Sequence, residues 1–219
     1  FYSDYVETYI ERDVSEMLNV RDKFQFRRFM ELIASLTGEE LIYDNIAKII
    51  GIDKKTVMSW LSVLIAGDIV YLLDPYNEIS ISKRIIKRPK LYFTDTGLAC
   101  YLARLNSGEI LGSSAFSGRF VETYIINEIK KSYVNNGIEP NFYYYRDSDM
   151  NEIDLVIIQD GKLHRIECKS GIKFNNNAVK GFKQLDKTNY QIGFKVIICN
   201  TDTVYPLDDN VYVLPLAGI

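Results

Sequence analysis

Cysteine, net positive charge and long apolar runs are all scarce in this sequence, and each scarcity excludes a class of protein. The three cysteines, Cys100, Cys168 and Cys199, are widely separated and form no CxxC pair, which argues against a zinc site or a disulfide framework and favours a reducing cytoplasm. No apolar run reaches the ~18 residues that span a bilayer, and no signal-peptide pattern opens the chain, so no membrane partner is expected. The net charge of −3 provides no polycation, so nucleic acid would be contacted only through local patches.

The 219 residues suffice for one large domain or two small ones, and a hydrophobic content of 47% is ordinary for a globular protein. The chain begins at Phe1 within an amphipathic pattern, in which Tyr2, Tyr5 and Tyr9 recur at helical spacing. This pattern predicts a helix over residues 1–22 and suggests a piece cut from a longer protein. A full chain that lacks a disordered start is the alternative.

Residues 23–110 have the pattern of a winged helix-turn-helix domain. An apolar stripe predicts a helix over 24–36, and a second pair of helices is expected over 44–50 and 54–64. Between that pair, Gly51 suits a left-handed turn and Asp53 suits a helix N-cap. A helix, a short turn containing Gly and a helix make a helix-turn-helix. Strands are then predicted over 69–73, 79–82 and 90–94, with a turn at 74–77 that would make the first two a wing.

Residues 111–219 are predicted to form a second, α/β domain with a mixed sheet, which makes the whole chain α+β. The small, polar stretch over 106–114 is the best candidate for the boundary between the domains. The elements expected beyond it are a helix over 118–133, strands over 142–146, 152–159 and 162–169, a helix near 176–187, and strands over 194–199 and 211–214.

Asp160-Gly161 is a strong signal for a two-residue β-hairpin, because a type I′ turn needs positive φ at both central residues. If these two residues form the turn, Asp154 faces Glu167 across the hairpin. Strict alternation of side chains then places four residues on one face of the sheet. They are Glu152, Asp154, Glu167 and Lys169.

Two carboxylates that face each other at ~4.5–5.5 Å are destabilising unless a cation neutralises them. A hard divalent ion such as Mg²⁺ takes carboxylate and water oxygens, and Lys169 beside it would stabilise charge on an attacked phosphate. The alternative is a solvated strand face with one salt bridge. Ile153, Leu155 and Val156 make this strand apolar on both faces, which indicates a covered sheet and favours the metal site.

Asp154, followed after twelve residues by Glu167-Cys168-Lys169, resembles the D…ExK core of the PD-(D/E)XK nuclease superfamily, whose domain is restriction-endonuclease-like. That superfamily also uses an acid on the preceding helix, and Glu122 matches it. The resemblance implies that Asp154 and Glu167 hold Mg²⁺ or Mn²⁺, that Lys169 assists the nucleophile, and that Glu122 orients a metal-bound water. The Gln-x-x-x-Tyr helix of some relatives is not matched, because Gln184 and Tyr190 are six residues apart.

Further segments resemble, in order, the C-terminal region of a prokaryotic family of predicted AAA-class ATP-binding proteins with a domain of unknown function. The resemblance implies an ATPase domain upstream of Phe1, with residues 1–22 continuing from it. No G-x-x-x-x-G-K-[ST] occurs in these residues, so ATP would bind only in that upstream domain. The matching segments are Tyr9 to Val14, Pro89 to Leu98, Tyr145 to Asp147, Asn151 to Asp154, and Ile166 to Ser170.

Two basic clusters are candidates for DNA contact. Lys54 and Lys55 begin the predicted recognition helix, where they would reach phosphates or the major groove. A second cluster follows the predicted wing, and it would contact phosphates or, alternatively, guard an exposed sheet edge. It comprises Lys83, Arg84, Lys87, Arg88 and Lys90.

The leading interpretation is a cytoplasmic DNA-binding and nuclease-like region of an ATP-dependent protein, with metal-dependent phosphodiester hydrolysis if the site is active. The alternative is a non-catalytic module that binds protein or DNA and regulates the upstream ATPase. Winged helices also dock protein partners, so an adaptor that uses chiefly the winged helix is a third interpretation.

Overall fold

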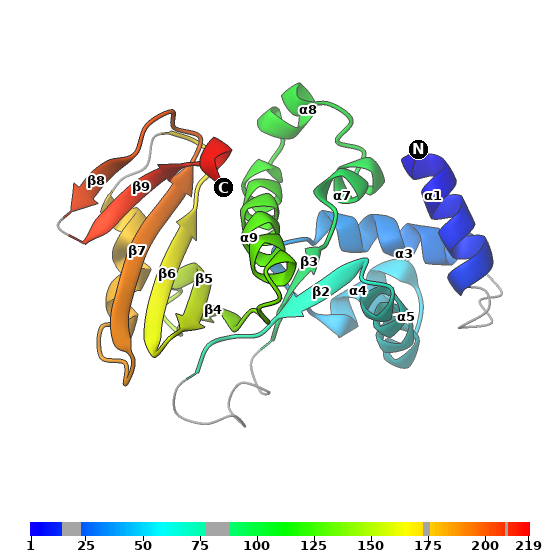
Figure 1. The fold of residues 1–219 in the computed structure, drawn as a ribbon. Helices are drawn as coiled ribbons and strands as arrows, with labels where there is room; N and C mark the ends of the chain where they lie inside the picture. The colour runs from blue at the N-terminus through cyan, green and yellow to red at the C-terminus, as the bar shows by residue number, and fades with distance from the viewer. Residues whose placement is uncertain (15–22, 78–87, 173–175, 209) are drawn as a thin grey trace. The chain divides into compact units, whose positions relative to one another are not determined.

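The computed structural model describes residues 1–14, 23–77, 88–172, 176–208 and 210–219 (Figure 1). Two compact units are present, the first comprising Phe1–Leu72 with Leu91–Phe116 and the second Leu73–Lys90 with Ser117–Ile219. The chain is α+β, as predicted, with a mixed six-stranded sheet and several helices. Within the described ranges, no helix combines the length and apolar character needed to cross a membrane.

The first unit begins with helix α1 (Tyr2–Thr8), which continues directly into the π-helical segment η1 (Tyr9–Val14). The helix predicted over 1–22 is therefore confirmed over residues 2–14, and residues 15–22 lie outside the described ranges. Helix α3 (Lys23–Ser35) follows where the apolar stripe predicted it, with Phe26, Phe29 and Met30 fully buried.

Helices α4 (Tyr43–Ile50) and α5 (Lys54–Ala66) confirm the predicted helix pair. Gly51 ends α4 at φ 80°, in the left-handed region that glycine adopts without a Cβ penalty. The Asp53 carboxylate caps α5 by accepting a hydrogen bond from the Thr56 backbone N–H at 3.0 Å. Local capping chemistry thus fixes the two helix ends that meet at the turn.

A small three-stranded sheet accompanies these helices, in the order β1-β3-β2. Strands β2 (Val70–Leu73) and β3 (Lys90–Phe93) confirm two predicted strands, whereas β1 (Glu39–Glu40) was not predicted. The returning strand expected over 79–82 lies outside the described residues, so the wing stays a prediction.

Two short helices were also missed by the sequence interpretation. Helix α7 (Thr96–Leu102) is capped by the Asp95 carboxylate, and α8 (Gly108–Ser113) is capped by the Ser107 hydroxyl. Helix α8 occupies the small, polar stretch that was interpreted as a domain boundary. The division between the compact units falls just after it, between Phe116 and Ser117, and residues 73–90 are grouped with the second unit.

The second unit is built on the six-stranded sheet, in the order β4-β5-β6-β7-β9-β8. The pairs β4/β5, β5/β6 and β8/β9 are antiparallel, and β6/β7 and β7/β9 are parallel. Every strand predicted here is present, and the edge strand β8 is additional. Their bounds are β4 (Phe142–Arg146), β5 (Glu152–Gln159), β6 (Lys162–Cys168), β7 (Gln191–Cys199), β8 (Tyr205–Asp208) and β9 (Val211–Pro215).

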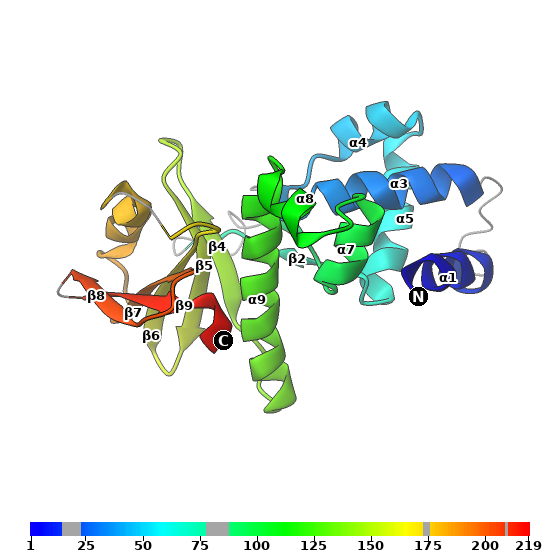
Figure 2. The ribbon, with the colours of Figure 1, turned by 90° about the horizontal axis from the view of Figure 1, so that it is seen from above.

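Helix α9 (Ser117–Asn135) covers one face of this sheet and the 3₁₀ segment η2 (Asn176–Leu185) covers the other, as Figures 1 and 2 show from two directions. A short 3₁₀ turn, η3 (Leu216–Gly218), follows the last strand. Phe182 of η2 packs with Ile153, Val156 and Ile197 in the core on its face. The sheet is therefore covered on both sides, as the apolar β5 sequence predicted.

The segment Leu73–Lys90 is attached along the outer edge of β4 at both of its described ends. Pro75 forms an isolated parallel bridge with Tyr144, and the Tyr76 N–H donates to the Tyr144 carbonyl at 2.6 Å. At the other end, the Tyr144 hydroxyl donates to the Arg88 carbonyl at 2.5 Å. These contacts bring Lys90 to the second unit as part of its structure.

Candidate metal and phosphate site

The β5–β6 hairpin has the predicted turn and register. Asp160 and Gly161 both have positive φ, 50° and 73°, as a type I′ turn requires. Pairing begins at Gln159 with Lys162 and continues in step to Leu155 with Ile166. The hairpin therefore brings the carboxyl end of β6 beside the start of β5, where the acidic residues lie.

The strict alternation assumed for β5 does not continue to Asp154. On the other side of β5, Tyr143 pairs with Val156 and Tyr145 pairs with Ile153, so β5 contains one residue more than β4 between these pairs. This irregularity turns Ile153 and Val156 toward the same core, although strict alternation would separate them. The predicted pairing of Asp154 with Glu167 is not among the pairs of β5 and β6, which end at Leu155 with Ile166.

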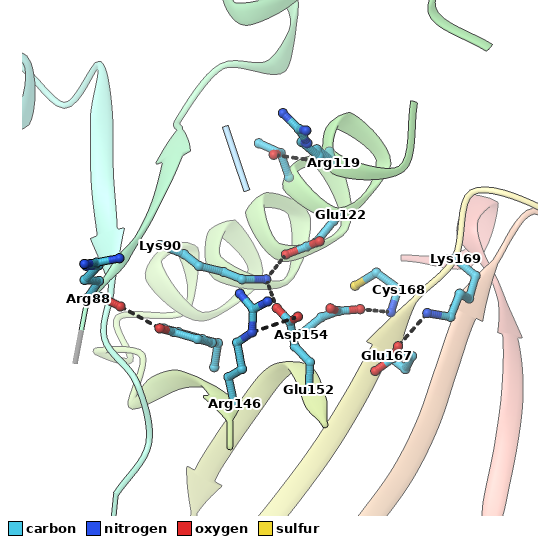
Figure 3. Close-up of polar contacts among 12 residues, drawn as sticks. Arg88, Lys90, Arg119, Glu122, Arg146, Glu152, Asp154, Glu167, Cys168 and Lys169 are labelled. Carbon is cyan, nitrogen blue, oxygen red and sulfur yellow. Dashed lines mark hydrogen bonds and ion pairs between the residues drawn. The ribbon is translucent and has the colours of Figure 1, made fainter. Parts of the chain in front are cut away.

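The side chain of Asp154 instead reaches the backbone at the end of β6 (Figure 3). Its carboxylate Oδ2 accepts a hydrogen bond from the Cys168 backbone N–H at 2.7 Å, and the residue is only 7% exposed. Burial raises the pKa of Asp154, while the charges of Lys90 and Lys169 and the Cys168 hydrogen bond oppose the rise. The carboxylate is therefore fixed in position by the backbone of β6.

Glu167 lies close to Asp154 near the end of β6. Its Oε1 accepts from the Lys169 ammonium at 2.5 Å, whereas its Oε2 is buried and has no hydrogen-bond partner among the residues that the structure describes. Burial raises the pKa of Glu167 to about 9, with the charge of Asp154 adding to the rise and Lys169 opposing it. A buried carboxylate oxygen without a partner is costly, so this oxygen is suited to a ligand.

Lys169, the third residue of the predicted constellation, is about one-third exposed at its side chain. Burial lowers the pKa of its ammonium, but the charges of Glu167 and Asp154 outweigh this effect and raise the pKa. Lys169 therefore stays charged beside the two acids, where it can interact with an anion such as phosphate.

Glu122 approaches the same cluster from α9, but its carboxylate is bound to a lysine that the sequence interpretation had assigned elsewhere. The Lys90 ammonium lies 2.9 Å from Glu122 Oε1 and 2.5 Å from Glu152 Oε1 (Figure 3). Burial lowers the pKa of Lys90, but the charges of Glu122, Asp154 and Glu152 outweigh it and raise the pKa. Glu152 also lies 4.0 Å from Arg146 Nε.

The sequence contained a signal for this role of Lys90. It stands at the head of the apolar run Leu91-Tyr92-Phe93 in a strand whose residues are all buried. A charged residue at the head of such a strand needs a buried partner. The interpretation of Lys90 as one of a run of DNA-contacting cations was therefore wrong.

A polar cavity of about 440 Å³ opens beside Glu167 and Lys169. Its wall is completed from β5, η2 and the loop before β5. Gly181 allows η2 to lie close to β5, because a side chain at this position would collide with the Glu152 carbonyl oxygen. Other lining residues include Asn151, Glu152 and Lys180.

The donors of this cluster fit one hard divalent ion rather than a complete protein cage. No group of three or more His, Cys, Asp or Glu side chains within the described ranges has the arrangement of metal ligands. The two carboxylates of Asp154 and Glu167 nevertheless supply oxygen donors, including the buried Oε2 atom of Glu167. Mg²⁺ and Mn²⁺ commonly take one or two carboxylates and complete their coordination with water.

Apart from Lys90, three of the six candidate DNA-contacting residues lie within the described ranges. Lys54 lies at the start of α5, but its ammonium is paired with the Asp44 carboxylate at 3.0 Å. Lys55 and Arg88 are exposed. The other three predicted residues, Lys83, Arg84 and Lys87, lie outside the described ranges.

The two halves of the chain match two different family models. Residues 1–109 match a family described as "Domain of unknown function (DUF8612)", and residues 117–219 match "Domain of unknown function (DUF4143)". The two matches meet within eight residues of each other, close to the division between the compact units.

The chain is also similar to the uncharacterized proteins Rv2008c of Mycobacterium tuberculosis and Mb2031c of Mycobacterium bovis. Each is 24% identical over 212 residues, which cover 96% of this chain and 46% of the relative. The chain thus spans about half the length of these curated relatives. Protein VC1899 of Vibrio cholerae, a solved structure, is 15% identical, with 99% of this chain and 53% of that chain covered and a TM-score of 0.27.

Proposed function

We propose that the second unit is a PD-(D/E)XK nuclease-like domain that hydrolyses phosphodiester bonds with Mg²⁺ or Mn²⁺. The observation that carries the proposal is the buried Oε2 atom of Glu167, which has no partner in the described residues although Asp154 and Lys169 lie beside it. A second carboxylate, a lysine and a polar cavity at the same place are the elements such chemistry needs.

Asp154 and Glu167 would hold the metal ion, which when bound would polarise the scissile phosphate and lower the pKa of a water. Lys169 pairs with Glu167, and its side chain is exposed enough to reach a phosphate oxygen at the cavity. Its ammonium would stabilise the negative charge that builds up during attack. We assign Glu122 a positioning role instead, because its Oε1 atom pairs with the Lys90 ammonium at 2.9 Å.

The first unit supports DNA binding by a winged helix-turn-helix domain. Helices α4 and α5, a three-residue turn between them and a small sheet are the parts of such a domain. Lys55 is exposed at the beginning of α5, at the end of a recognition helix that contacts base edges. DNA is therefore the substrate that accounts best for the proposed activities of both units. We expect an upstream AAA-class ATPase domain in the whole protein.

A specific observation favours the alternative of a non-catalytic binding module. The four carboxylates of the cluster already lie among three cationic side chains of the same unit, Lys90, Arg146 and Lys169. A cluster so nearly neutral can persist without a metal ion. In this case the cavity would bind a partner or a nucleic acid without cleaving it, and would regulate the ATPase.

Cleavage assays on single- and double-stranded DNA and RNA, with Mg²⁺ and with Mn²⁺, separate these functions. The parent chain is expected to cleave at least one substrate, and Asp154→Asn and Glu167→Gln are expected to abolish cleavage while the protein stays folded. Glu139→Gln is the matched control, because Glu139 is exposed and lies away from the cluster in sequence. Equal activity in parent and Glu167→Gln would identify a contaminating nuclease. If the parent shows no activity, even with an upstream ATPase domain and ATP, the nuclease proposal is refuted and the non-catalytic binding module is favoured.

A further inference from the structure

We infer that Lys90 is a built-in cation that occupies the position of a second metal ion, so that the acidic cluster binds one divalent ion and not two. This inference rests on the proposed function and specifies how the four carboxylates divide. Asp154 and Glu167 would bind the exchangeable ion, and Glu122 and Glu152 would pair with the ammonium of Lys90.

The contacts of Lys90 support this division. Carboxylates from two different elements, Glu122 of α9 and Glu152 of β5, converge on its single ammonium at 2.9 and 2.5 Å. The side chain is only 5% exposed. A divalent ion that bridged these two acids would have to displace the ammonium from the same oxygens.

The third side of the ammonium faces an aromatic ring. Lys90 Nζ lies 5.4 Å from the centroid of Tyr144, within the range of a cation–π contact. The Tyr144 hydroxyl in turn donates to the Arg88 carbonyl, two residues before Lys90. A lysine ammonium has three donors, so two carboxylates and a ring face surround it and hold it in place.

Lys169 differs from Lys90 in the features that an exchangeable site needs. Its side chain is 33% exposed, against 5% for Lys90, and it borders the cavity. It contacts a single carboxylate, Glu167, whose other oxygen is without a partner in the described residues. The ammonium of Lys90 is therefore enclosed, whereas Lys169 and Glu167 border the cavity, where they can meet an ion.

Two-ion sites bind a pair of ions at neighbouring positions to stabilise the attacking and leaving oxygens. A covalently attached ammonium supplies one positive charge at one of these positions without depending on the concentration of metal. It also has no exchangeable water, so it can neutralise and position acids but cannot activate a nucleophile. Lys90 is therefore a positioning residue, which acts through Glu122 and Glu152.

The test is the number of Mn²⁺ ions bound by the 219-residue chain, measured by titration calorimetry and by the loss of free Mn²⁺ signal in electron paramagnetic resonance. The parent is expected to bind one ion, and Glu167→Gln none. Lys90→Ala is expected to bind a second ion between Glu122 and Glu152. Lys90→Arg is expected to bind one ion in total, like the parent. Adding Glu122→Gln to Lys90→Ala should return the number to one. Lys180→Ala is the matched control, because Lys180 is an exposed lysine that lines the same cavity, and it should leave the number at one.

Two ions on the parent would overturn the inference and leave the proposed function standing. No ion on the parent would refute the proposed metal site, and one ion gained by Lys90→Ala would still show that Lys90 takes a cation position. An unchanged number in Lys90→Ala would show that Lys90 is only structural, which overturns the inference. If Lys90→Ala unfolds in EDTA, its refolding on addition of Mn²⁺ supports the inference, and failure to refold with Mn²⁺ overturns it.

Discussion

Replacing Glu167 by Gln should make the second unit more stable at alkaline pH and remove part of its pH dependence. Burial and the neighbouring Asp154 raise the pKa of Glu167 from its ordinary value of 4.5 to about 9. Between these values the folded protein holds a proton that the unfolded chain has lost. The free energy of unfolding therefore falls as pH rises through this window.

The upper limit of the effect is about 1.4 kcal/mol per pH unit. Between pH 5.5 and 8.5, the free energy of unfolding of the parent could thus fall by up to about 4 kcal/mol relative to that of Glu167→Gln. The fall is smaller if Asp154 shares the proton with Glu167. Gln is neutral throughout this range and has nearly the same shape. The two proteins should have similar stability at pH 5.5 and should diverge steadily above it.

Urea unfolding in EDTA, followed by far-ultraviolet circular dichroism at several pH values, measures this difference. Trp60 lies in the core of the first unit, against Phe26 and Phe29, so its fluorescence reports that unit and should give the same transition in both proteins. Glu139→Gln controls for the loss of an exposed carboxylate. A stability difference that does not change with pH, or a variant less stable than the parent at pH 8.5, would refute the burial argument.

Two other changes test the remaining parts of the site and the DNA surface. Lys169→Ala should lower the rate of metal-dependent cleavage by roughly a hundredfold, because an ammonium that stabilises transition-state charge contributes several kcal/mol. An unaffected rate in single-turnover assays would exclude that role. Replacing the four cations between positions 83 and 88 by Ala should weaken DNA binding and reduce the slope of log affinity against log salt by ~0.9 for each lost phosphate contact. An unchanged slope would indicate that this cluster is a solvated edge.

The parts of the fold that local chemistry determines could be predicted from the sequence. Asp160-Gly161 fixes both the turn and the register of the hairpin, because only a few residue types adopt positive φ in succession. Gly51 and Asp53 mark the two helix ends at the turn in the same way. Strands with strong apolar character were also found, although their ends differ by a few residues.

The parts that depend on distant contacts could not be predicted. The extra residue of β5 near Asp154 appears only when β5 is aligned with β4, which has no sequence signal at that point. Edge strand β8 has a weakly apolar sequence and is defined by pairing with β9. The place of Lys90 depends on the attachment of residues 73–90 to the second unit, far from the hairpin in sequence. Asp154, Glu167 and Lys169 were expected together because one hairpin carries them, whereas Lys90 and Glu152 were joined only by tertiary structure.

The central claim is that Asp154 and Glu167 share an exchangeable divalent ion, and the most direct measurement is the anomalous diffraction signal of Mn²⁺ in crystals of the 219-residue chain. We expect one peak within coordination distance of an oxygen of each carboxylate, Glu167 Oε2 among them, and we expect it to disappear in Glu167→Gln. A Mn²⁺ peak elsewhere in the second unit, or no peak at a concentration that saturates binding in solution, would contradict it.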